Sequence, residues 1–463
     1  MNERGFTEKY NKLPKRSAKR SVYTRFCPVG TKGAGAGALV ATANRNCDFR
    51  GGRLGGVAGT KVYFLHYDDV ATIPKIPATY GKALRFFTLQ WKNSSGVKKD
   101  SIGALAENQK MFIYDLDLDA FKMISSAANL VTVRNFYDSS DHERLLFCAA
   151  KEAYAYDLVN LKKWIFKTTP LSAACVFHER VFFASEHTLK YSAPMIYDNF
   201  TESIEAGGSV RLNSDLGEIV GLEPLGECIY IIRQFGIMKL EGGGAANDFT
   251  VEVLPYKGEQ VIGSSICVCG DRIFFLAYDG LYAFDGKNVE AIGRGLDLRP
   301  LRAEQFCAPG YFDGKFHLTF TDEAGEKRTV FVDLREDGNF GETFVMHGLS
   351  VSHGRAIVDN DRAISYLDPS GDLPTGEEYS FDVSGADFGV AGEKLLRSVE
   401  LCGEGNCSLT VVGRNGSKKV DFALGDGKTA KKFCLKGGEF DLAIRLQKGC
   451  VIDSLAVDFE KIG

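Results

Sequence analysis

Tryptophan, histidine and long apolar runs are scarce in this sequence. Only two of its 463 residues are tryptophan and seven are histidine, and no run of 18 apolar residues occurs. The lack of such a run excludes a membrane-spanning helix. No two cysteines form a Cys-x-x-Cys pair, which is the usual start of a structural zinc site. We therefore expect neither a metal nor a cofactor.

Motifs of the common catalytic sites are missing as well. The Gly-x-Ser-x-Gly elbow of α/β hydrolases does not occur. Gly33, Gly35 and Gly37 alternate with other residues, but no apolar strand precedes them and no Gly-Lys-Ser/Thr follows. They therefore match neither a dinucleotide-binding fingerprint nor a phosphate-binding loop. We predict no catalytic residue and no enzymatic activity.

The start of the chain and its thiols bear on the compartment. The first ten residues, MNERGFTEKY, contain neither the apolar core nor the cleavage site of a signal peptide. Most of the 12 cysteines fall inside apolar runs such as LLFCAA (145–150), where free thiols behave as small buried hydrophobes. We expect synthesis and folding in a cytoplasm.

Glycine and phenylalanine, by contrast, are abundant. The chain holds 51 glycines and 33 phenylalanines, and aromatic residues make up 11% of it. Glycine supplies the positive φ of tight turns, and aromatic side chains suit the half-buried face of a strand. The composition therefore favours an all-β fold.

One pattern recurs between about residues 131 and 367: an apolar strand, a tight turn, an aromatic strand, then a second turn and strand. Its copies lie at 175–194, 222–242, 267–286, 310–320 and 356–368. The first apolar residue after the turn recurs every 43 to 48 positions, at Val181, Ile229, Ile273, Phe316 and Ala363. A unit of about 40–50 residues with three or four short strands is the size of one β-propeller blade.

Residues 83–124 and 144–167 fit two more blades, and the strand-like segment 57–69 has no blade of its own. Pairing this segment with the short last unit closes the ring and removes its open edges. We predict a β-propeller over residues 57–368 with seven blades, six being the alternative count.

The pattern changes after a linker at 368–378. In FDLAIRL (440–446) apolar and polar residues alternate strictly, and similar short segments flank the turn pairs Asn415-Gly416 and Asp426-Gly427. About 85 residues with six or so such strands predict a small antiparallel β-sandwich over residues 379–463.

Residues 1–56 show no period and are strongly basic. They hold 12 Lys and Arg against three acidic residues, a net charge of +9 in a chain whose total is −4. We predict a basic, Gly-rich extended arm that becomes ordered only against a partner. Its candidate interaction residues suit an acidic protein surface or non-specific contact with DNA phosphates: Lys15, Arg16, Lys19, Arg20 and Arg25.

Two stretches carry a resemblance to a known family. Residues 192–244 contain the segments SAP, DNF and EIVGL, and residues 265–293 contain GDRIFFLAYDGLYAFDG. Together they resemble the propeller proteins of tailed-bacteriophage virions, of the tail-hub or packaged-DNA stabilisation type. The run DFGVAGEKLLRSVELCGEG (387–405) is similar to the start of the sandwich beside such propellers.

The resemblance implies a non-enzymatic structural component of a phage or prophage particle that acts in head-to-tail or tail-hub assembly through protein–protein contacts. Its implied partners are other virion proteins of the portal or tail ring and further copies of the chain in a homo-oligomeric ring. The implied location is the virion, after synthesis in the bacterial host cytoplasm.

A glycan-binding or glycan-cleaving propeller, such as a tail receptor-binding protein, is the alternative. A sugar site needs solvent-facing aromatic rings flanked by carboxylates in the central funnel of the propeller. A structural component needs none, so the exposure of these rings distinguishes the two hypotheses.

Overall fold

A computed structural model of the chain describes residues 18–462 apart from short gaps. The gaps fall at 33, 64, 68–69, 73, 93–97, 116–119, 126–129, 138–142, 150–151, 157–160, 166–169, 204–205, 213–214, 243–247, 337–338, 353 and 361–362. The described residues form strands joined by loops and by short 3₁₀ turns, η1 (Arg50–Gly52), η2 (Ala78–Tyr80) and η3 (Gly263–Ser265). No helix in this part of the chain is long and apolar enough to cross a membrane. The all-β prediction is confirmed.

The chain divides into two compact units. The propeller unit comprises Gly59–Leu334 and Val345–Pro374, and the terminal unit comprises Met1–Ala58, Arg335–Phe344 and Thr375–Gly463.

Seven four-stranded sheets are found within the described residues, and they are the blades of the predicted propeller. The first three blades are β10 (Ala83–Lys92), β11 (Lys98–Ala106), β12 (Met111–Asp115) and β13 (Ala120–Ser125); β14 (Leu130–Tyr137), β15 (Glu143–Ala149), β16 (Glu152–Tyr156) and β17 (Leu161–Ile165); and β18 (Ala173–Phe177), β19 (Arg180–Ser185), β20 (Thr188–Tyr191) and β21 (Gly208–Arg211).

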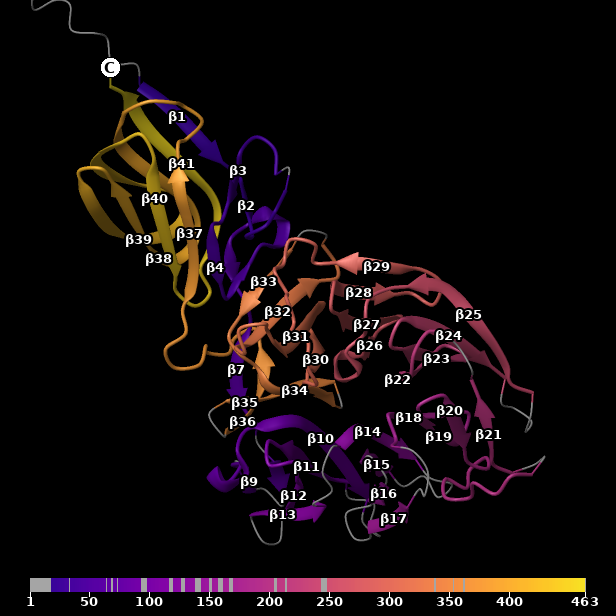
Figure 1. Ribbon diagram of the computed structural model, residues 1–463. Coiled ribbons are helices and arrows are strands. Elements are labelled where there is room, and N and C mark those ends of the chain that lie inside the picture. The colour runs from indigo at the N-terminus through magenta and orange to yellow at the C-terminus, as the bar shows by residue number, and fades with distance from the viewer. Residues whose placement is uncertain are drawn as a thin grey trace, which may run out of the picture. The chain divides into compact units, whose positions relative to one another are not determined.

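The next four complete the ring and confirm the count of seven. They are β22 (Ile219–Leu225), β23 (Cys228–Arg233), β24 (Gly236–Glu241) and β25 (Thr250–Lys257); β26 (Cys267–Cys269), β27 (Arg272–Ala277), β28 (Gly280–Phe284) and β29 (Val289–Ile292); β30 (Ala308–Phe312), β31 (Lys315–Thr321), β32 (Lys327–Asp333) and β33 (Phe340–Thr343); and β34 (His347–Ser352), β35 (Arg355–Asn360), β36 (Ala363–Asp368) and β7 (Gly59–Val62). Figure 1 shows the first strand of each blade nearest the centre of the ring.

The second strand of each blade carries the apolar run that the repeat predicted. All six residues of β19 are buried, and five of six in β27. Both faces of such a strand are covered because a propeller blade packs between two neighbours. Ile237 of the fourth blade and Phe275 of the fifth share one such core cluster.

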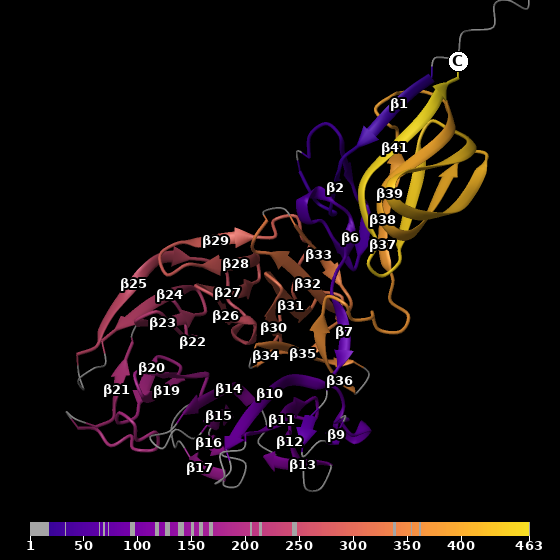
Figure 2. The same cartoon turned by 180° about the vertical axis from the view of Figure 1, so that it is seen from behind.

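The ring closes through β7, as the sequence predicts. Val62 pairs with Ser365 and Gly59 with Asp368, in an antiparallel ladder between β7 and β36 (Figure 2). A Cβ on Gly59 would lie 2.6 Å from the carbonyl carbon of Asp372, and one on Gly371 would lie 2.6 Å from the nitrogen of Thr60. The two backbones thus meet at a distance that only glycine allows. A separate hairpin, β8 (Leu65–Tyr67) and β9 (Val70–Thr72), follows β7.

One repeat marker is misplaced. Val181, Ile229, Ile273 and Phe316 lie on the second strands of their blades, but Ala363 lies on the third strand, β36. The equivalent position is Ala356, at the start of β35. In this copy Ala363 follows the second strand, whereas the markers of the other copies follow the turn between the first and second strands.

The terminal unit is built on one antiparallel sheet. Its order is β1 (Ala18–Tyr23), β41 (Val451–Lys461), β38 (Lys394–Gly413), β40 (Phe440–Leu446), β37 (Tyr379–Ala386) and β4 (Ala43–Arg45), with β39 (Gly416–Gly437) paired along β38. The alternation in β40 buries the predicted apolar face: Phe440, Leu442, Ile444 and Leu446. Two small sheets complete the unit, β2 (Arg25–Cys27) with β3 (Ala38–Val40), and β5 (Cys47–Asp48) with β6 (Gly55–Gly56).

The sheet curls into the two layers of the predicted sandwich because its longest hairpin bends. The first half of β38 pairs with β41, and its second half pairs with β40. The register shifts at Gly403, and Gly405 has φ 86°. Gly427 lies opposite Gly403 on β39, so glycines on both strands let the hairpin bend without losing its partner.

This bend corrects the predicted strand count. Asn415 does lie in the turn between β38 and β39, but the pair Asp426-Gly427 lies inside β39 and ends no strand. The short segments predicted beside these two turn pairs therefore belong to two long strands, of 20 and 22 residues.

The basic segment also differs from the extended arm predicted over 1–56. From residue 18 onward it contributes strands to the terminal unit: β1 pairs with β41 and β4 with β37. Buried side chains such as Phe26, Cys47 and Leu54 explain the difference, because an arm without a core would leave them in water. Residues 1–17 lie outside the described part of the chain.

Candidate binding sites

Three of the five predicted basic residues lie within the described chain. Lys19 and Arg20 are on β1 and Arg25 is on β2, whereas Lys15 and Arg16 lie outside. Arg20 donates to Glu400 at 2.7 Å and to Asp458 at 3.3 Å, two carboxylates of its own unit. Its charge is therefore already compensated.

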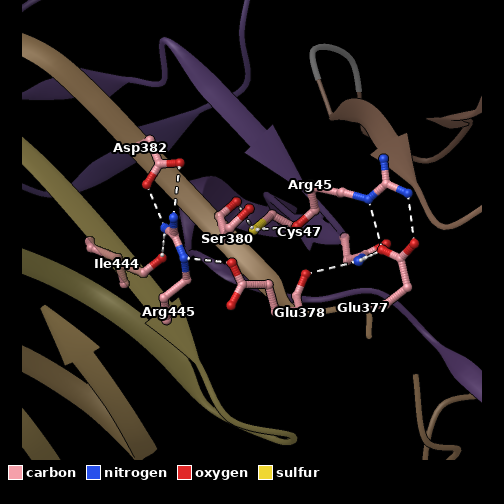
Figure 3. A network of polar contacts seen from close by, with 9 residues as sticks. Arg45, Cys47, Glu377, Glu378, Ser380, Asp382, Ile444 and Arg445 are labelled. Atoms are coloured by element: carbon pink, nitrogen blue, oxygen red, sulfur yellow. Dashed lines mark hydrogen bonds and ion pairs between the residues drawn. The ribbon is translucent and has the colours of Figure 1, made fainter. Parts of the chain in front are cut away.

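A polar network attaches the N-terminal segment to the terminal sheet (Figure 3). Arg45 at the end of β4 forms a two-pronged ion pair with Glu377, both N···O distances being 2.7 Å. Arg445 of β40 binds Asp382 at 2.5 Å and Glu378 at 2.8 Å. These contacts join β4, β37 and β40 side by side.

Asn46, next to Arg45, is a fully buried centre of this network. Its amide nitrogen donates to Glu377 at 3.0 Å and to the carbonyl oxygen of Glu378 at 2.9 Å. Its side-chain oxygen accepts from the Thr343 hydroxyl at 3.1 Å and from the Phe344 N–H at 2.6 Å. Its φ of 56° is a conformation that asparagine tolerates better than most residues.

The basic face that sequence analysis missed lies on β39. Within the described residues β39 pairs with β38 alone, so its second edge has no strand partner. Six exposed lysines lie along it: Lys418, Lys419, Lys428, Lys431, Lys432 and Lys436. We call these six residues the lysine edge. Against the two aspartates of the same strand they leave a net charge of +4.

The central channel of the propeller is the second place where polar groups gather. A cavity of about 650 Å³ and another of about 430 Å³ are lined by the first strands of the blades or by residues next to them, all round the ring. Both cavities share Arg85, Arg134, Glu223 and Ile266. The channel therefore carries a charged cluster between its two wider parts.

Burial shifts the pKa of groups in the charged cluster. Arg134 of β14 forms an ion pair with Glu223 of β22, whose side chain is buried. Burial raises the pKa of Glu223, although Arg134 and Arg85 oppose this. Burial, and next the charge of Arg134, lower the pKa of Arg85 to about 10. The Arg85 guanidinium therefore remains charged near neutral pH.

Two aromatic rings line the larger cavity, and each has a cation over it. The Arg85 guanidinium lies 5.4 Å from the centre of the Phe306 ring, and Arg302 lies 5.1 Å from that of Tyr278. A sugar needs such a ring to be open for stacking, so this part of the channel does not favour the glycan alternative. The side chains of Trp91 and Trp164 lie outside the described set.

Two thiols of the propeller unit lie close together. The Sγ atoms of Cys267 and Cys269 on β26 are 3.6 Å apart. All 12 cysteines are free thiols. Among the residues that the structure describes, no three His, Cys, Asp or Glu side chains are grouped to hold a metal ion.

Comparisons with known proteins add only the fold. No protein-family model and no curated protein matches the sequence. The WD40 domain of Neurospora crassa Pan2 is 11% identical, with 65% of this chain and 93% of that chain covered and a TM-score of 0.39. The WD40 domain of SCAP from fission yeast is 10% identical, with 87% of this chain and 94% of that chain covered and a TM-score of 0.32. BBS1N in complex with ARL6DN is 9% identical, with 69% of this chain and 99% of that chain covered and a TM-score of 0.41. Similarity at this level carries no argument about function.

Proposed function

We propose that the chain is a non-enzymatic structural component of a tailed-phage particle whose copies associate head to tail, the lysine edge of one copy binding the acidic propeller unit of the next. The observation that carries the proposal is the 22-residue strand β39, with one unpaired edge and six exposed lysines. The resemblance of residues 192–244 and 265–293 to virion propellers supports the proposal that the chain is part of a phage particle.

The two units have charges of opposite sign. The propeller unit holds 31 Lys and Arg against 40 Asp and Glu, a net charge of −9, and the terminal unit holds 25 against 20, a net of +5. Opposite charges on two parts of one chain favour contact between unlike surfaces of different copies. A contact of this kind closes into a ring when its rotation allows.

The unpaired edge supplies a second source of affinity. An exposed strand edge presents a row of N–H and C=O groups to which an extended segment of another chain can add. Lysines on an edge also discourage uncontrolled aggregation. An acidic segment of the partner would neutralise the lysine edge and so be selected over other strands.

Sedimentation velocity of the full chain tests the proposal. At low salt and high protein concentration we expect oligomers that dissociate as salt rises, because exposed charges are screened. The double variant Lys431→Glu/Lys432→Glu should weaken association at least tenfold. The matched control Lys122→Glu/Lys287→Glu, which changes two exposed lysines of the propeller unit, should associate like wild type or more strongly.

Two results would contradict the proposal. One is a chain that remains monomeric at low salt and high concentration. The other is tight binding of duplex DNA that the Lys431→Glu/Lys432→Glu variant loses, because this would assign the lysine edge to phosphates instead of to protein.

A further inference from the structure

Arg85 is a cation without a partner in the wall of the central channel. It lies on the first strand of the first blade and lines both cavities. Within the described residues its guanidinium forms no hydrogen bond and no ion pair, and it lies 5.4 Å from the centre of the Phe306 ring. A guanidinium has five N–H donors, and leaving them unpaired in a confined site is costly.

Within the charged cluster the arginines outnumber the carboxylates. Arg134 and Arg85 contribute two charges, and Glu223 compensates one of them through its ion pair with Arg134. The Ser172 hydroxyl lines the larger cavity, is buried and has no hydrogen-bond partner in the described structure. The cluster thus offers unused donors and holds two guanidinium groups against one carboxylate.

We propose that the central channel binds a small organic carboxylate, which Arg85 holds through its guanidinium with Arg134 and Ser172 beside it. The carboxylate would supply the missing charge and two acceptor oxygens in the planar arrangement that a guanidinium prefers. The larger cavity, at about 650 Å³, has the size of a small-molecule site. This inference does not depend on the proposed function.

The wall of the larger cavity selects the class of anion. Glu186, Glu218 and Glu304 line it and are exposed. Their negative charges disfavour a doubly charged phosphate more strongly than a singly charged carboxylate. A singly charged carboxylate whose remainder is neutral or cationic is compatible with both Arg85 and these glutamates.

Isothermal titration of the full chain with acetate, benzoate, glycine and inorganic phosphate at constant ionic strength tests the proposal. We expect at least one carboxylate to bind more tightly than phosphate, with at least a tenfold weaker Kd in Arg85→Gln. Arg85→Lys keeps the charge but loses the two-pronged geometry, so its Kd should lie between those of wild type and Arg85→Gln. Arg397→Gln removes an exposed cation of the terminal unit and should bind like wild type.

Thermal unfolding without added carboxylate gives an independent reading. Arg85→Gln should melt at or above the wild-type Tm, because it removes a confined charge that lacks a partner. The proposal is overturned if no carboxylate binds the wild type, if binding is unchanged in both Arg85 variants, or if phosphate binds more tightly than every carboxylate. It is also overturned if Arg85→Gln melts clearly below wild type, since Arg85 would then be structural.

Discussion

At the scale of single residues, Asn46 is the centre that attaches the N-terminal segment. It is fully buried, and its side chain makes four hydrogen bonds to Glu377, Glu378, Thr343 and Phe344. The sequence gives no sign of this role, because the partners are about 300 positions away along the chain. A buried group of this kind stabilises a unit by leaving none of its partners unsatisfied.

Replacing the amide of Asn46 by a carboxylate should therefore be costly. Asn46→Asp removes the two donated hydrogen bonds and places a second carboxylate beside Glu377, so we expect a loss of about 2–4 kcal/mol in the free energy of unfolding. Asn44→Asp is the matched control, because half-buried Asn44 accepts a hydrogen bond from the Val29 N–H but donates none among the described residues, and it should change stability by only about 0.5 kcal/mol. Urea unfolding at pH 7 measures both; equal losses would refute this role.

A second residue should make the propeller unit sensitive to acid. His317 on β31 is buried, its Nδ1 lacks a hydrogen-bond partner in the described chain, and burial lowers its pKa to about 3. As pH falls below the usual histidine pKa of about 6.5, the unfolded chain takes up a proton that the folded chain refuses, so stability present above about pH 6.5 is lost towards pH 3. Between pH 7 and 5 this group should account for about 2 kcal/mol.

His317→Phe should remove that share of the pH dependence. Urea unfolding of wild type and variant at pH 7 and pH 5 gives the difference directly. Parallel losses in the two proteins would show that His317 takes no part.

At the scale of elements, short-range pattern was sufficient for the blades but not for the terminal unit. The apolar second strands and the closing segment were predictable because the blades repeat at a nearly constant spacing and the last unit lacks a strand at its open edge. The bend in β38 and β39 was not, because Gly403 and Gly427 indicate turns until one knows that they face each other across a hairpin. The strand β1 could not be predicted either, because its pairing partner β41 lies more than 400 residues away in the sequence.

Deleting residues 1–24 should consequently destabilise the terminal unit. The deletion removes β1, which pairs with β41 through the six residues from Ala18 to Tyr23. It therefore leaves that edge of β41 without a strand partner. We expect differential scanning calorimetry to show a lower Tm than for a chain that lacks only residues 1–17. A transition identical in the two deletion variants would mean that β1 adds nothing to the stability of the unit.

At the scale of the whole molecule, the candidate sites come from groups that sequence order separates. Arg85, Arg134 and Glu223 lie on three different blades and meet only because first strands line one channel. The lysine edge was within reach of sequence analysis, since Phe422, Leu424, Phe433 and Leu435 alternate with polar residues and are buried. The predicted interaction residues lie on the basic segment 1–56 instead. One of them, Arg20, is paired with Glu400 of its own unit.

Charge separation between the units is the property on which the proposed assembly rests. The lysine edge lies on a unit of net charge +5, and the propeller unit has a net charge of −9. Arg20 and Arg45 are already bound to carboxylates of their own unit, as is Lys428 of the lysine edge, which lies 3.5 Å from Glu400. They are therefore less suited than Lys431 and Lys432 to bind a partner.

Carbodiimide cross-linking of purified particles, read by mass spectrometry, is the most direct test. The particles come from a culture that encodes the chain, and the reagent joins lysines to carboxylates in contact. The account predicts that the chain is present in the particles and that Lys431 or Lys432 is joined to an Asp or Glu of the propeller unit in a different copy. Absence of the chain from the particles, or cross-links of the lysine edge confined to one copy, would contradict it.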